Sequence, residues 1–83
     1  MNLNAELNRS YLREYHKEIR KHLLPGEQVS QAGVYCCMPC RSGSPGWEFW
    51  GPRNFHTYVR ANDAYAARIV GWQQWIRMFG KEK

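Results

Sequence analysis

The spacing of apolar residues changes twice along this chain, and the change limits what the chain can fold into. Near both ends apolar side chains recur every three or four residues, which is typical of amphipathic helices. Between these segments apolar residues alternate with others, which indicates β-strands. A length of 83 residues leaves room for one small domain only. We therefore expect one α+β domain over residues 1–83, in the order helix, three-stranded sheet, helix.

The first helix is predicted over about residues 3–24, because Pro25 and Gly26 then end the pattern. Its apolar stripe includes Leu3, Leu7, Tyr11, Tyr15 and Ile19. At the angular spacing of a helix, the cations fall on the side away from this stripe, where Glu6 is the only acid expected. These cations are Arg9, Arg13, Lys17, Arg20 and Lys21.

The middle of the chain predicts strands at about residues 33–39, 47–50 and 55–61. Turn-forming residues separate them at 41–46 and 51–54, and such short connections favour an antiparallel β meander. A second helix is predicted over about residues 63–79, with Asn62 or Asp63 as its N-cap. We expect helix packing on one face of the sheet, and Gly71 would allow a close approach.

Cysteine spacing raises the question of a metal. Cys37 and Cys40 have the C-x-x-C spacing of zinc ligands, and His56 is a candidate further ligand. Because no second C-x-x-C follows, we favour reduced cysteines that pack as small apolar residues, with no cofactor. A structural zinc is the first alternative and a thiol-redox role the second.

The segment Cys37-Met38-Pro39-Cys40 resembles the C-x-P-C redox motif of thioredoxin-like proteins. In that family the nucleophilic cysteine begins a helix whose dipole lowers the pKa of the thiol. Here residues 41–46 predict a turn instead, so we do not carry the activity over. The acids are scattered and neither a phosphate-binding glycine loop nor an H-E-x-x-H motif occurs, so we expect a protein that is not an enzyme.

Aromatic residues and cations are interleaved around the predicted strands. In a domain this small most large side chains are needed for the core. Alternation places Trp47 and Phe49 on one face and Trp50 on the other, so Trp50, Tyr58 and Arg60 are expected to be exposed. Exposed rings among cations can stack on nucleic-acid bases. The predicted binding residues here are Trp50, Arg53, Tyr58 and Arg60.

A formal charge of +5 and the basic helix side together favour an acidic partner. Nucleic acid is the first expectation, bound by the helix cations with help from the aromatic residues. The alternative is an acidic protein surface. The passage from Tyr58 to Ile69 resembles the closing unit of many compact α+β proteins of phages and mobile elements. That resemblance implies an accessory inhibitor docked on an acidic groove of a host nucleic-acid-handling complex.

The longest apolar run, Val34 to Met38, is too short to span a bilayer. The opening residues lack a basic segment followed by an apolar one, so no secretory signal is expected. We therefore expect a cytoplasmic protein with reduced cysteines and no membrane partner. The oligomeric state is left open by the sequence.

Overall fold

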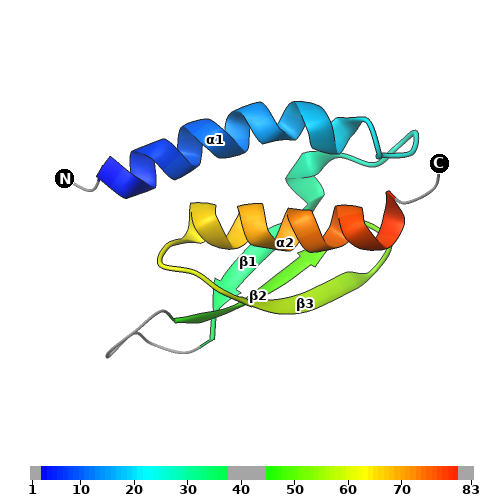
Figure 1. Ribbon diagram of the computed structural model, residues 1–83. Coiled ribbons are helices and arrows are strands. Elements are labelled where there is room, and N and C mark those ends of the chain that lie inside the picture. Colours follow the sequence, from blue (N-terminus) through cyan, green and yellow to red (C-terminus); the bar gives the residue numbers. More distant parts are fainter. Residues whose placement is uncertain (1–2, 38–44, 81–83) are drawn as a thin grey trace.

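Two helices and three strands follow one another in the expected order (Figure 1). The computed structural model describes residues 3–37 and 45–80. The predicted α+β fold class is confirmed. The elements are α1 (Leu3–Arg20), a short 3-10 helix η1 (Val29–Gln31), β1 (Gly33–Cys36), β2 (Gly46–Gly51), β3 (Phe55–Arg60) and α2 (Ala64–Phe79).

The strands form an antiparallel meander in the order β1-β2-β3. Val34 pairs with Phe49, and Phe49 pairs with Thr57 on the other side. These three side chains share one face of the sheet, because side chains alternate along a strand. Thr57 donates its hydroxyl to Gln74 of α2 at 2.7 Å, so this is the face that α2 covers.

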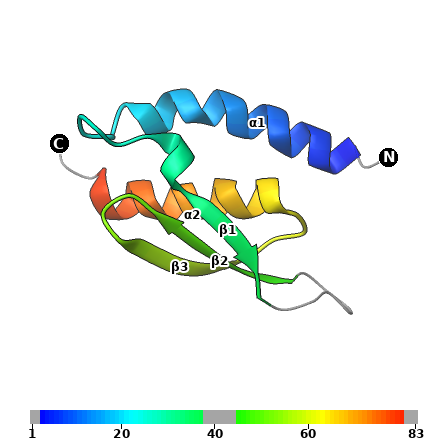
Figure 2. The ribbon, with the colours of Figure 1, turned by 180° about the vertical axis from the view of Figure 1, so that it is seen from behind.

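The domain has three layers, with α2 in the middle (Figures 1 and 2). One side of α2 lies on the sheet and the other side carries α1, which packs on α2 rather than on the strands. Both sides of α2 are therefore apolar. Its largest residues, Trp72 and Trp75, are 1% and 0% exposed.

The core lies where these layers meet. Phe49 contacts Trp72 edge to face at 5.5 Å between ring centroids, and Trp72 contacts Trp75 at 5.2 Å. Leu12 and Ile19 of α1 complete this cluster from the other side. The indole N–H of Trp75 donates to the carbonyl of Pro52 at 3.0 Å, so burial leaves no unpaired donor on this ring.

The element ends differ from the predictions in two places. The first helix ends at Arg20 instead of about residue 24, although Leu23 still packs against the core. The apolar spacing therefore continues past the point where the backbone stops being α-helical. The first strand ends at Cys36, and residues 38 and 39 of the predicted strand lie outside the described residues. The start of α2 agrees with the prediction: the carboxylate of Asp63 accepts the N–H of Ala66 at 2.8 Å.

The contact between Gly71 and Phe49 gives the first prediction. A Cβ atom at residue 71 would clash with Cγ and Cδ1 of Phe49, whose ring is fully buried. We expect Gly71→Ala to lower the free energy of unfolding by about 1–3 kcal/mol, because overpacking outweighs the roughly 1 kcal/mol gain in helix propensity. Urea unfolding measures the change. Gln73→Ala, at an exposed position of the same helix, should stay within about 0.5 kcal/mol of the parent protein. A Gly71→Ala protein as stable as the parent would contradict this packing.

Candidate functional site

One face of the sheet is not covered by any described element, and we call it the open sheet face. The face opposite α2 carries one large aromatic residue from each strand. Tyr35, Trp50 and Tyr58 are 62%, 42% and 64% exposed. The other side chains of this face are those of Glu48, His56 and Arg60. The expected exposure of Trp50, Tyr58 and Arg60 is confirmed.

The register sets where each ring lies. Tyr35, Glu48 and Tyr58 form one row across the three strands. Trp50 lies in the next row, opposite Gly33 of β1. A Cβ atom at Gly33 would lie 2.8 Å from Cζ2 of Trp50, so the indole occupies the space that a side chain would fill. The missing side chain thus allows the indole to lie close over the sheet.

Polar groups on this face are partly paired with one another. The His56 ring lies 5.1 Å from the Tyr58 ring, edge to face, and its Nε2 lies 3.4 Å from a carboxylate oxygen of Glu48. The carboxylate is therefore shared with an imidazole. Arg60 is exposed, and no acid in the described part of the chain pairs with it. Among the described residues, the open sheet face thus offers stacking rings and a guanidinium without an acid partner.

The structure places Arg53 away from this face. Its guanidinium donates to both carboxylate oxygens of Glu27 at 2.9 Å and to the carbonyl of His22 at 3.0 Å. It also lies 4.9 Å from the Trp75 ring centroid and 4.7 Å from that of Phe79. These contacts join the turn between β2 and β3 to the segment after α1 and to the end of α2. Arg53 thus stabilises the fold.

The predicted helix cations lie on a different side of the molecule. They extend from α1, and α2 separates α1 from the sheet (Figure 1). The expected absence of acids on this side, apart from Glu6, is wrong: Lys17 lies 3.5 Å from Glu14, and Lys21 lies 3.4 Å from Glu18. Such exposed pairs one helical turn apart contribute little stability but partly neutralise the surface. Of the five predicted helix cations, Arg9, Arg13 and Arg20 have no paired acid among the described residues.

The predicted metal ligands are not all brought together. Cys37 lies beside Gly46, whose carbonyl accepts its N–H at 3.0 Å and its thiol at 3.5 Å. His56 pairs with Trp50. Trp50 is four residues from Gly46 along β2, a separation of about 13 Å. One zinc ion could not bind both side chains. Cys40 lies outside the described residues, so its pairing with Cys37 stays a prediction. Within residues 3–37 and 45–80 no three His, Cys, Asp or Glu residues form a metal-binding cluster.

Two features of these sites were not predicted from the sequence. Tyr35 belongs to the open sheet face, and the alternation of Val34, Tyr35 and Cys36 is the signal that could have placed it there. The pairing of Glu27 with Arg53 joins residues 26 positions apart, for which a single sequence contains no signal.

Comparisons of the chain with protein-family models, curated proteins and solved structures gave no match. Neither helix in the described part of the chain is both long and apolar enough to cross a membrane.

The ion pair between Glu27 and Arg53 gives the second prediction. The hydrogen bonds from Arg53 and from the Leu24 backbone hold the pKa of Glu27 below its ordinary value of 4.5. The pair therefore stabilises the fold above pH 4.5, and this contribution is lost as the pH falls through the lower pKa of the folded protein. We expect Glu27→Gln to cost about 1–2 kcal/mol at neutral pH and progressively less in acid.

Urea unfolding across a pH series measures this difference. Glu14→Gln is the matched control, because Glu14 belongs to an exposed ion pair, and it should change stability by less than about 0.5 kcal/mol. A cost for Glu27→Gln that is the same at neutral and acidic pH would contradict the assigned role of the carboxylate.

Proposed function

We propose that this protein binds single-stranded nucleic acid on the open sheet face and acts without catalysis. The observation that supports the proposal is the presence of one exposed aromatic residue on each strand of a sheet face that no described element covers. The formal charge of +5 favours the same class of ligand, because it attracts a polyanion.

Stacking is the main interaction in this proposal. Each base that stacks on an aromatic side chain contributes about 1–3 kcal/mol, with little dependence on its identity. Tyr35 and Tyr58 lie two strand spacings apart in one row, about 10 Å, and Trp50 lies between them in the next row. Rings spread in this way can take successive bases of an unpaired strand. In a duplex the bases are already stacked inside the helix, so the proposal favours single strands.

Charge supplies the second interaction. Arg60 lies at the end of β3, next to Tyr58 on the same face with one residue between them, and no described acid pairs with it. Its guanidinium can form two parallel hydrogen bonds with a phosphate. Glu48 is unfavourable to a polyanion, but its carboxylate is partly engaged by His56, whose Nε2 lies 3.4 Å from it.

A second candidate function is the docking of α1 on an acidic protein surface, in the manner of an accessory inhibitor. Arg9 and Arg13 have no paired acid among the described residues, and the same helix exposes Leu7 and Tyr11 by 67% and 51%. Cations beside exposed apolar groups are common at protein interfaces. This surface lies on the other side of α2 from the open sheet face, so the two candidates can be tested independently.

Replacing the exposed rings gives the third prediction. We expect Tyr35→Ala, Trp50→Ala and Tyr58→Ala each to weaken binding of a short unstructured DNA or RNA by roughly 5- to 150-fold, the equivalent of about 1–3 kcal/mol of stacking. Fluorescence anisotropy of a labelled oligonucleotide measures the affinity. Tyr11→Ala removes a ring of similar exposure from α1 and should leave the affinity unchanged. If the three sheet-face variants bind as well as the parent protein, the open sheet face is not the binding site.

The salt dependence of binding gives the fourth prediction. Arg60→Gln should weaken binding and lower the slope of log affinity against log salt concentration by about 1, because one phosphate contact is lost. Arg13→Gln removes one cation from α1, as Arg60→Gln removes one from the sheet, and should leave most of the affinity intact. The opposite result, a large loss from the α1 variant and none from Arg60→Gln, would assign binding to α1 and reject the open sheet face.

A further inference from the structure

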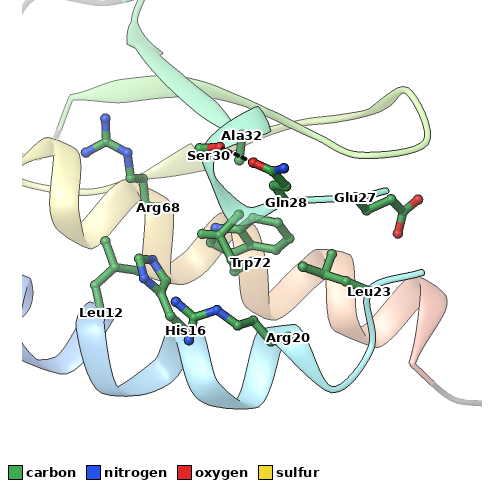
Figure 3. Close-up of a pocket in the computed structure, with 11 residues that line it drawn as sticks. Leu12, His16, Arg20, Leu23, Glu27, Gln28, Ser30, Ala32, Arg68 and Trp72 are labelled. Carbon is green, nitrogen blue, oxygen red and sulfur yellow. Dashed lines mark hydrogen bonds between the residues drawn. The ribbon is translucent and has the colours of Figure 1, made fainter. Parts of the chain in front are cut away.

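A groove of about 810 Å³ lies between α1, the η1 segment and α2 (Figure 3). His16 and Arg20 lie side by side on α1. Arg68 extends from α2, and its guanidinium points away from these two and lies 6.0 Å from the Tyr65 ring centroid. Gln28 and Ser30 form the wall opposite α1. Pockets of this size commonly hold small molecules.

The charges in the groove are strongly unbalanced. Neither Arg20 nor Arg68 pairs with an acid in the described part of the chain. Glu27 is the acid in the lining, and Arg53 already engages both of its oxygens at 2.9 Å. The groove therefore has two guanidinium groups without a counter-ion and an acid that is already neutralised.

His16 responds to this imbalance. Burial, together with the positive charges of Arg20 and Arg68, lowers the pKa of its imidazole. A bound anion would reverse the effect of the two charges, because it favours the protonated ring. His16 is thus both a third donor for an anion and a natural reporter of its binding.

The remaining lining favours a ligand with an apolar part. Leu23 and Val29 are partly buried residues of the lining, and Trp72 lies at the base of the groove (Figure 3). On the opposite wall the hydroxyl of Ser30 donates to the side-chain oxygen of Gln28 at 3.2 Å. This hydrogen bond leaves the amide NH₂ of Gln28 as a further donor.

We infer that this groove binds a small phosphate monoester with an apolar body. One arginine is enough to pair with both oxygens of a carboxylate. Arg20 and His16 already lie side by side, and Arg68 of the facing helix can turn toward them, so three groups are available for the three terminal oxygens of a phosphate monoester. The apolar body would lie against Leu23 and Val29.

Phenyl phosphate is the probe for the test. We expect it to shift the His16 ring signal in a saturable way in ¹H NMR and to raise the pKa of His16, while the His56 signal stays unchanged. Arg20→Gln and Arg68→Gln should each weaken this binding at least about tenfold, which is typical of losing a charge-assisted hydrogen bond. Arg13→Gln and Arg77→Gln remove exposed arginines outside the groove and should change the affinity by less than about twofold.

The remaining arms test the ligand class and the site. Inorganic phosphate should bind more weakly than phenyl phosphate, because it lacks the apolar body. Benzoate binding as tight as that of phenyl phosphate would overturn the assignment to phosphate, and no saturable His16 shift up to about 10 mM phenyl phosphate would overturn the site itself. Trp50→Ala should retain phenyl phosphate binding, so failure of this proposal is distinguishable from failure of the nucleic-acid proposal.

Discussion

The approach of α2 to β2 at Gly71 is the contact on which the rest of the structure depends. The Phe49 ring lies so close to the Gly71 backbone that no Cβ atom would fit between them. This contact sets the distance between the helix and the sheet, and it places Trp72 and Trp75 where they pack with Phe49 or with one another. A glycine inside a helix lowers stability by about 1 kcal/mol relative to alanine, and the burial of these aromatic rings contributes more than that.

Both candidate sites follow from this layer arrangement. Because α2 covers one face of the sheet and α1 packs on the far side of α2, no described element is left to cover the other face (Figure 2). The aromatic residues of that face are therefore exposed. The groove forms where η1, α1 and α2 do not close against each other. The ion pair between Arg53 and Glu27 holds the segment that leads from α1 to η1, which forms one wall of the groove.

Periodicity was sufficient to predict the order and type of the elements, because each apolar stripe faces a neighbouring layer. It also predicted the exposure of Trp50 and Tyr58, since alternation along a paired strand decides the face. It did not predict that α1 packs on α2, which separates the α1 cations from the aromatic residues. The groove and the contacts of Arg53 join residues far apart in sequence, so tertiary structure was needed to find them.

Binding on the open sheet face can be tested by mapping the amide and indole chemical-shift changes when a short unstructured oligonucleotide is titrated into the ¹⁵N-labelled protein. We predict saturable changes in β1, β2 and β3 and at the Trp50 indole N–H, with the buried Trp72 and Trp75 indoles and α1 little affected. Changes confined to α1, or no saturable change at low salt, would contradict binding of single-stranded nucleic acid on the open sheet face.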